Sequence, residues 1–495
     1  MSANHDMLTK VRGPQSPAAA TWHVAHIDVL CAVFLGSALR LACLSCKSMW
    51  LDEVLSISVA RLGPGPLLAG TSEVYHPPLY FLILSGWLRL GDSVAQVRLL
   101  SALAGILVIP TLYLVSKVLL GRRAATSAAW FAALAPLPIW YAQEARDYSL
   151  LLLLSVLALL GLANLVTKPR LHWWGLFVVG TTAAFYTHYS AFLALVVQVI
   201  VATILLSRKR GSSISLLYVA AGWIAVVLLY LPWLNTPGAQ RFRTLLTASS
   251  FYINVLTAGR ARLPDGLEFL LEQDLPRVAG LIALCGLVVA LAGLSALYRM
   301  IRSRPIWLLK LRYHPVVKYL VSGCFVLLTT LSVIPRGYTV KRYTLVLWPI
   351  AFIGLAWVWP WHRGNKRALS ALLSLSLLAS LANVFVVPKA QWDQVVQLVL
   401  AEQEPGDGVL LSPPYVGLCF DYYAKGQMPY TGVGQDGAES ALTRLFEAHP
   451  RLWFVSDTMD VDPHRVAILE WLDEHAQQRS ATDFYRVRVE LYQLK

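Results

Sequence analysis

Two adjacent carboxylates, Asp52 and Glu53, stand just beyond an apolar run long enough to cross a membrane. A carboxylate at a membrane boundary is costly when it faces lipid, so it usually faces a polar cavity or a metal. A positioned carboxylate can also take a proton from a hydroxyl group. The pair is therefore a candidate catalytic site. The simpler alternative is a hydrated helix cap, because Asp is favoured where helices begin.

Two further polar clusters follow. His76, in YHPPLY at 75–80, is a donor that can contact a phosphate or a metal, although taken alone the stretch is a rigid proline turn with a histidine. YAQEARDYS, at 141–149, packs Glu144, Arg146 and Asp147 beside Tyr148 into a very short connection between two apolar runs. A hairpin between two spans needs a turn but not three charges, so this stretch favours a functional role.

A third cluster combines THYS at 187–190, which is a tight turn, with PRGYTVKRY at 335–343. The second stretch offers Arg342 and Tyr343 together with other basic residues. Basic groups at headgroup depth often have an anionic partner, and phosphate is the obvious candidate. Snorkelling of these side chains to lipid headgroups is the alternative.

The composition indicates what kind of protein must position these residues. The chain has 495 residues, of which 57% are hydrophobic and 14% are charged, against roughly 25% charged in a typical soluble domain. This indicates an integral membrane protein. The net charge of +14 comes from short basic clusters between apolar segments, which is typical of helix orientation in a bilayer and argues against nucleic-acid binding. The six cysteines lack paired metal-ligand spacing, so neither a disulfide framework nor a zinc site is expected.

The apolar segments predict about eleven spans of near 20 residues. They lie at 27–46, 97–119, 124–141, 148–167, 172–188, 190–206, 214–234, 278–298, 316–334, 343–361 and 368–387. The shorter stretch 77–90 opens with two prolines and fits an interfacial or re-entrant helix better than a span.

The positive-inside rule supports this assignment, because every loop it places inside is basic. Residues 1–26 then form a cytoplasmic tail and residues 27–388 form the membrane domain. Its outer loops are expected at 47–96, 142–147, 235–277 and 335–342. Almost all carboxylates before residue 388 fall in these outer loops, and the candidate residues share one face.

Residues 389–495 carry nine Lys and Arg against sixteen Asp and Glu. The pattern predicts helices near 391–403, 437–448 and 463–478, and strands at GVLLS, RLWFVS and FYRVRVELYQL. This indicates a small soluble α/β domain, which an odd number of spans places outside the membrane. It lacks a glycine-rich phosphate loop and a nucleophile elbow, so a binding or stabilising role is expected.

In order and spacing, the Asp-Glu pair, the HPPLYF helix, YAQEARDYSL and RYTLVLWP resemble the GT-C superfamily of polyprenyl-phosphate-sugar-dependent glycosyltransferases. The similarity is to the branch of the protein mannosyltransferases and the lipid A aminoarabinose transferase. It covers most of residues 27–350. The resemblance implies an inverting transfer to an acceptor hydroxyl, in a cavity at the extracytoplasmic face of the inner membrane.

The resemblance also implies roles for individual residues. Asp52 is the expected catalytic carboxylate, and Glu53 would support it. His76, Arg146 and Arg342, with Tyr343 beside them, would hold the donor phosphate. Glu144, Asp147 and Tyr148 would bind the acceptor or support Arg146.

The expected partners are a polyprenyl-phosphate sugar donor, membrane lipids and a protein, lipid or glycan acceptor, without nucleic acid. The sequence requires no cofactor. Some relatives use a divalent cation at the first acid, so a metal is allowed, but no compact ligand set predicts one. A transporter or flippase of lipid-linked sugar and a non-catalytic membrane scaffold are the alternatives. Charges gathered at one face, rather than near the bilayer midplane, favour the enzyme.

Overall fold

The computed structural model describes residues 17–71, 76–208, 213–241, 315–333, 342–361, 366–432, 438–458 and 463–495. The predicted span at 278–298, most of the predicted outer loop at 235–277 and the outer loop at 335–342 up to residue 341 lie outside the described residues. So do most of the predicted cytoplasmic tail and the carboxylates between 265 and 274.

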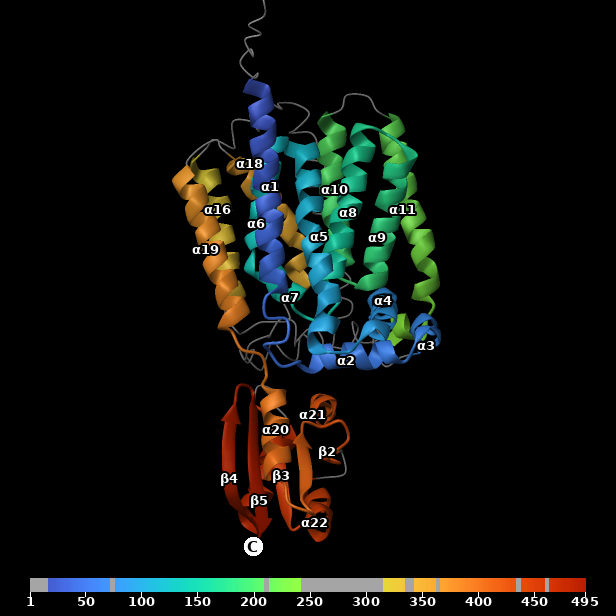
Figure 1. The fold of residues 1–495 in the computed structure, drawn as a ribbon. Coiled ribbons are helices and arrows are strands. Elements are labelled where there is room, and N and C mark those ends of the chain that lie inside the picture. The colour runs from blue at the N-terminus through green and yellow to red at the C-terminus, as the bar shows by residue number, and fades with distance from the viewer. Residues whose placement is uncertain are drawn as a thin grey trace, which may run out of the picture.

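A bundle of roughly parallel helices forms the larger part of the molecule (Figure 1). Its long helices are α1 (Pro17–Leu41), α5 (Val94–Leu120), α6 (Arg122–Leu134), α8 (Tyr148–Thr167), α9 (Leu171–Thr187), α10 (Ala191–Arg208), α11 (Ser213–Leu234), α16 (Pro315–Val333) and α19 (Lys366–Phe385). The chain enters the bundle at the start of α1, and the C-terminal domain lies beyond the opposite end.

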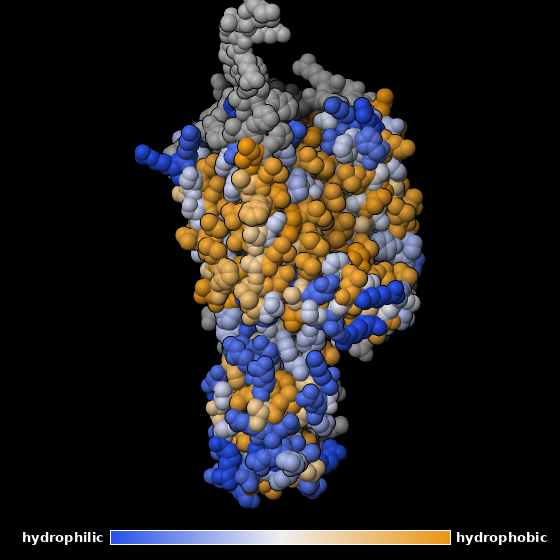
Figure 2. All heavy atoms as spheres, in the orientation of Figure 1, coloured by the Kyte–Doolittle hydropathy of each residue, from blue (hydrophilic) through white to orange (hydrophobic). Residues whose placement is uncertain are grey.

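The flank of the bundle is apolar, whereas the C-terminal domain is mostly hydrophilic (Figure 2). Large side chains such as Leu217 and Ile224 of α11 are exposed along it. Within the described residues, four helices are long and apolar enough to cross a membrane: Val94–Leu120, Tyr148–Thr167, Ile214–Leu234 and Lys366–Phe385. A wide exposed apolar surface of this kind is stable in lipid, so the bundle is a membrane domain. The number of eleven spans stays a prediction.

The predicted span at 124–141 is wrong as one helix, because it divides into α6 and α7 (Pro136–Ala142). Ala135 adopts an extended backbone, as a residue before proline prefers. The last carbonyl groups of α6 then lack partners within the helix. Arg40 donates to the carbonyls of Ala132 and Ala133, and two serines of α19 donate to that of Leu134. The break is thus stabilised by side chains from two other helices.

The first span also differs from its predicted bounds of 27–46. Helix α1 begins at Pro17 and ends at Leu41, and the next residues form a turn. Cys43 has a left-handed backbone, with a φ of 60°, and forms a disulfide with Cys46. The expectation of no disulfide framework is therefore corrected to one local disulfide, which closes the turn that leads to Asp52.

Short helices cover the end of the bundle next to the C-terminal domain (Figure 1). They are α2 (Leu51–Arg61), α3 (Pro64–Ala69), α4 (Leu79–Trp87) and the 3-10 helix η1 (Leu88–Leu90). Helix α4 occupies the stretch expected to be interfacial. Its nine residues extend about 14 Å, which is too short to cross a membrane. A further 3-10 helix, η2 (Leu345–Leu347), leads into α18 (Trp348–Val358).

The C-terminal domain contains a five-stranded sheet with the order β2-β1-β3-β5-β4. The strands are β1 (Gly408–Ser412), β2 (Thr431–Gly432), β3 (Arg451–Asp457), β4 (Ala476–Phe484) and β5 (Val487–Leu494). β1 is parallel to β2 and β3, and β5 is antiparallel to β3 and β4. The helices are α20 (Trp392–Glu402), α21 (Gly417–Ala424), α22 (Ala438–Ala448) and α23 (Pro463–His475), with the 3-10 helix η3 (Pro414–Val416). The predicted small α/β domain is confirmed.

Two predicted bounds in this domain are wrong. The helix expected at 463–478 ends at His475, and residues 476–484 form β4, which pairs with β5. β4 is a mostly exposed edge strand of polar residues, so it has none of the apolar alternation that marks a half-buried strand. The closing strand accordingly begins at Val487.

The C-terminal domain is packed against the segment predicted as the first outer loop rather than tethered loosely. Tyr423 on α21 accepts a hydrogen bond from the backbone N–H of Met49 at 2.7 Å. One apolar cluster joins Met49 and Ile57 to Trp392 and Phe420 of the domain. The segment that leads to Asp52 therefore takes its position from the bundle and the domain together.

Candidate active site

Asp52 lies in the first turn of α2, where the extended backbone of Trp50 begins the helix. Its Oδ2 accepts a hydrogen bond from Nη1 of Arg342 at 2.7 Å, and about a fifth of each side chain is exposed. Arg146 binds the same turn, because its Nη1 donates to the carbonyl of Asp52 at 3.2 Å and to Oγ of Ser56 at 3.1 Å. The structure thus gathers an accessible carboxylate and two guanidinium groups that are far apart in the sequence.

Glu53 is fully buried. Arg98 on α5 donates to both of its carboxylate oxygens at 2.7 Å. Lys389 lies 3.2 Å from Oε2, and the backbone N–H of Ala145 donates to Oε1 at 2.9 Å. Burial alone would raise the pKa of Glu53, but Arg98 and Lys389 lower it to about 2. With no route to solvent, Glu53 holds α2 and the 143–147 loop in place, in keeping with a supporting role.

The 143–147 loop is fixed from several sides. Gln143 donates to the carbonyls of Leu39 and Ala42, and Ser101 donates to that of Arg146. Glu144 is 1% exposed and forms an ion pair with Lys389 at 3.2 Å. Burial and the nearby Glu53 raise the pKa of Glu144, against the opposing effect of Lys389. The charges predicted to be functional are therefore part of a rigid loop.

Aromatic rings surround the next part of the site. His76 stacks on His188, with ring centroids 4.8 Å apart. His188 also contacts Tyr148 and Tyr343, at centroid distances of 5.7 and 5.5 Å. The sequence marked the 187–190 turn as lying on this face, but not His188 as a site residue. Together these rings form a wall beside Asp147.

Several buried polar atoms in this wall and in the charged residues beside it have no hydrogen-bond partner within the described residues. They are both carboxylate oxygens of Asp147, Nε2 of His188, Nδ1 of His76 and the Nε atoms of Arg146 and Arg342. An unpaired buried polar atom costs about 1–3 kcal/mol. The two arginines and His188 offer N–H donors and Asp147 offers acceptors, so the arrangement is suited to a ligand that carries negative charge and hydroxyl groups.

Reasoning from sequence missed Arg98 and Lys389 as parts of the site. Arg98 falls at the start of a predicted span, where an ionisable residue usually has a buried partner. That signal alone could have identified it. Lys389 falls at the predicted boundary between the two domains, and nothing in its neighbourhood points to the Glu53 carboxylate 336 residues away.

A cation at this site would need ligands from three separate segments. His76, Asp147 and His188 place one potential ligand atom each within 4.8 Å of one another. However, the backbone N–H of Ser190 donates to Nδ1 of His188 at 2.9 Å, so the neutral ring carries its proton on Nε2. Neither nitrogen then offers a free lone pair, and the trio falls short of the three protein ligands typical of a transition-metal site.

Both histidines are kept neutral. Burial, with smaller effects of Arg146 and Arg342, lowers the pKa of His188 to about 4, although Asp147 opposes this shift. Burial and His188 lower the pKa of His76 as well. Neutral rings add hydrogen-bond capacity to the site without adding charge, so the positive charge here comes from the two arginines.

We predict that acidification destabilises the protein through His188. Between its ordinary pKa of 6.5 and its folded pKa of about 4, the unfolded chain binds a proton that the folded chain does not. Stability is therefore fully present above 6.5 and falls as the pH drops toward 4, by up to about 3 kcal/mol. Thermal unfolding in detergent at several pH values should show a weaker pH dependence for His188→Gln than for the wild type. Equal slopes would contradict the prediction.

Comparisons with known proteins bear on this geometry. A family model described as dolichyl-phosphate-mannose-protein mannosyltransferase matches residues 75–234. This range includes His76, the 143–147 loop and His188. No curated protein matches the chain by sequence.

Solved structures resemble the chain over most of its length. ArnT from Cupriavidus metallidurans in the apo state is 16% identical, with 96% of this chain and 98% of that chain covered and a TM-score of 0.49. The oligosaccharyltransferase of Archaeoglobus fulgidus, solved with zinc and sulfate, is 12% identical, with 90% and 69% covered and a TM-score of 0.50. The family match and the shared fold confirm the resemblance read from the motifs: this chain is similar to the GT-C glycosyltransferases, and its residues 75–234 match their dolichyl-phosphate-mannose-protein mannosyltransferase family.

Proposed function

We propose that this protein is a membrane glycosyltransferase that moves a sugar from a polyprenyl-phosphate carrier to an acceptor hydroxyl, with inversion, at the extracytoplasmic face. The observation that carries the proposal is the accessible Asp52 held between Arg342 and Arg146, beside buried polar atoms without partners. The matched family is described by a donor of this class, a mannose on dolichyl phosphate.

The donor phosphate would bind between Arg146 and Arg342, with His76 and His188 as neutral hydrogen-bonding neighbours and Tyr343 on the wall. Asp52 pairs with Arg342 at 2.7 Å. An arriving phosphate competes for that guanidinium, so donor binding would release the Asp52 carboxylate. The Asp52 carboxylate would thus leave Arg342 and become able to act as a base only when the donor is bound.

The chemical step is a single displacement. Asp52 takes the proton of the acceptor hydroxyl while the oxygen of that hydroxyl attacks the anomeric carbon of the donor sugar. The bond from that carbon to the phosphate oxygen breaks, and the phosphate leaves with the electron pair. Arg146 and Arg342 stabilise the charge that develops on the leaving group. Asp147 and Tyr148 would bind the acceptor or support Arg146, and no step requires a resident cation.

The reaction can be tested on the purified protein in detergent. A mixed pool of native polyprenyl-phosphate sugars and a glycan and lipid extract as acceptor are added, and mass spectrometry follows the release of free polyprenyl phosphate. Release identifies the donor by the species that disappears. Tight binding of the lipids without any release would instead favour the transporter or the scaffold.

Arg342→Gln is expected to lower the transfer rate by about 100-fold, because it removes a charged donor from the leaving phosphate. Arg61→Gln is the matched control, since Arg61 lies on α2 in an exposed ion pair with Asp92 that contributes little. Initial rates of polyprenyl phosphate release measure both variants. Similar rates for the two would contradict the role given to Arg342.

A further inference from the structure

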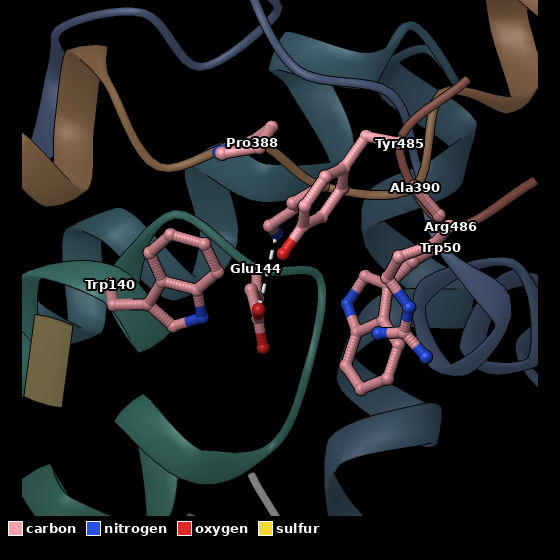
Figure 3. A pocket seen from close by; sticks show the side chains of 8 residues that line it. Trp50, Trp140, Glu144, Pro388, Ala390, Tyr485 and Arg486 are labelled. Atoms are coloured by element: carbon pink, nitrogen blue, oxygen red, sulfur yellow. Dashed lines mark ion pairs between the residues drawn. The ribbon is translucent and has the colours of Figure 1, made fainter. Parts of the chain in front are cut away.

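Two spaces lined by described residues differ in what they can hold. The seam between the two domains, where Glu144 pairs with Lys389 beside Trp50 and Trp140, has room for about 20 Å³ (Figure 3). A water molecule needs about 10–15 Å³ of such space, so the seam holds about one water. An open groove on the flank of the bundle measures about 410 Å³. This volume lies within the roughly 300–1,000 Å³ of small-molecule sites.

The groove lies between α1 and α6, which are neighbours in the bundle (Figure 1). Its lining is apolar and consists of Ile27, Leu30, Cys31, Phe34 and Leu35 of α1 and Trp130 of α6. Positions 27, 30, 31 and 34 share one face of the helix and extend over about 10 Å. Leu30 and Phe34 are 65% and 77% exposed on the flank that faces lipid. The groove is therefore open to the acyl chains of a membrane.

The aromatic side of the groove is held by contacts to both helices. The ring of Trp130 stacks on that of Trp361, with centroids 5.8 Å apart and 7° between the planes. Nε1 of Trp361 donates to Oδ2 of Asp28 on α1 at 2.8 Å, and its backbone N–H donates to the carbonyl of Arg123 on α6 at 3.0 Å. This ring therefore has a fixed position beside α1.

The same contacts show which residue stands at the end of the groove. Gly36 packs closely on Ala133, since a Cβ atom at Gly36 would lie 3.0 Å from the Cα of Ala133. Because Trp361 joins the earlier parts of the two helices, α1 and α6 run side by side in the same direction. Nine residues back from that contact, Ile27 is level with the start of α6. Arg123 is seven residues before Trp130, which puts it on the same face and about 10 Å away.

Positive charge gathers at this end of the bundle. Arg123 is exposed and forms no ion pair within the part of the chain that the structure describes. Hydrophilic side chains border the apolar flank here (Figure 2). The other described basic residues at this end are Lys117, Arg122, Lys366 and Arg367. Asp28 is the one described carboxylate here, and it is bonded to Trp361. An apolar groove between membrane helices that ends at basic side chains is suited to an anionic lipid.

We propose that this groove binds one acyl chain of an anionic phospholipid, whose phosphate contacts Arg123. The lipid belongs to the leaflet remote from Asp52, so the inference does not depend on the proposed function. A polyprenyl-phosphate donor fits less well, because its phosphate would bind Arg146 and Arg342 at the opposite end of the bundle. A second copy of the chain also fits less well, since two basic ends would then face each other and repel.

The test uses native mass spectrometry of the full chain in detergent micelles with equal amounts of palmitoyl-oleoyl phosphatidylglycerol and phosphatidylcholine. The two lipids share their acyl chains and differ in the charge of the headgroup. We expect the wild type to retain phosphatidylglycerol in clear excess. Arg123→Gln should lower that excess by about 5-fold, the factor for one basic residue near an anionic surface. Arg170→Gln, exposed between α8 and α9 at the same end of the bundle, is the control and should leave it unchanged.

A second pair of variants tests the apolar part of the groove. Leu30→Trp should reduce the retained phosphatidylglycerol, because the indole occupies the space that the acyl chain needs. Leu217→Trp on α11 is the matched control, since Leu30 and Leu217 are 65% and 70% exposed. The unfolding temperature verifies that all four variants are folded.

Equal retention of the two lipids by the wild type would overturn the proposal. So would equal ratios for Arg123→Gln and Arg170→Gln, or equal retention by Leu30→Trp and Leu217→Trp. Displacement of phosphatidylglycerol by added polyprenyl phosphate would assign the groove to the donor, and a dimer that Leu30→Trp abolishes would assign it to a second copy. Asp52→Asn should retain phosphatidylglycerol like the wild type, so the outcome is independent of catalysis.

Discussion

Asp52→Asn is expected to reduce the transfer rate by roughly 10³-fold, because the amide cannot accept the proton of the acceptor hydroxyl. The substitution keeps the size and shape of the side chain, and Asp52 donates no hydrogen bond that the fold needs. Its side chain is partly exposed and pairs with Arg342 alone among the described residues. Folding should therefore be unaffected, which the thermal unfolding midpoint would verify.

Donor binding should distinguish this variant from a damaged protein. With Asn at position 52, the Arg342 guanidinium loses its internal counter-charge and becomes available to the phosphate. Polyprenyl phosphate should therefore bind Asp52→Asn at least as tightly as it binds the wild type, while release of that product from the sugar donor becomes very slow. A variant that keeps a tenth of the wild-type rate would exclude Asp52 as the general base. A variant that loses lipid binding would assign Asp52 to the donor site instead.

Arg98→Met is expected to be the most destabilising single change near the site, costing about 3–5 kcal/mol. Arg98 is 1% exposed, and its removal leaves the Glu53 carboxylate buried with Lys389 as its remaining cation. Breaking a buried ion pair by removing one partner is costly because the other charge stays desolvated. A loss of this size is a large fraction of the 5–15 kcal/mol that stabilises a typical protein. The unfolding temperature and the monodisperse fraction in detergent would measure it.

A double variant separates the charge effect from the loss of packing. Adding Glu53→Gln to Arg98→Met removes the buried carboxylate that has lost its main partner, so the double variant should recover part of the lost stability. Arg61→Gln, at the exposed pair with Asp92, should change the unfolding temperature very little. If Arg98→Met were as mild as Arg61→Gln, the Glu53 network would not be the anchor of α2.

Much of the architecture could be predicted from the sequence, because the dominant signals are local. Apolar runs of span length identify α5, α8 and α11 within a few residues. The strands β1 and β3 are continuous apolar runs because helices cover both faces of the sheet. Where the local signal is weak, the prediction was wrong. The polar edge strand β4 lacks alternation, and the break before Pro136 depends on partners from α1 and α19.

The sequence by itself determined that the chain is a membrane protein with a small α/β domain. It also predicted that polar residues gather at one face of the membrane domain. Composition and periodicity suffice for this, because burial in lipid or in a core acts on each segment separately. Only the tertiary structure decided which of those residues are accessible in the site and which are buried in support of it. Asp52 and Glu53 are neighbours in the chain, yet one faces Arg342 in an accessible site and the other is buried against Arg98 and Lys389. Their partners lie from 45 to 336 residues away, and a contact over that separation is set by packing rather than by any local pattern.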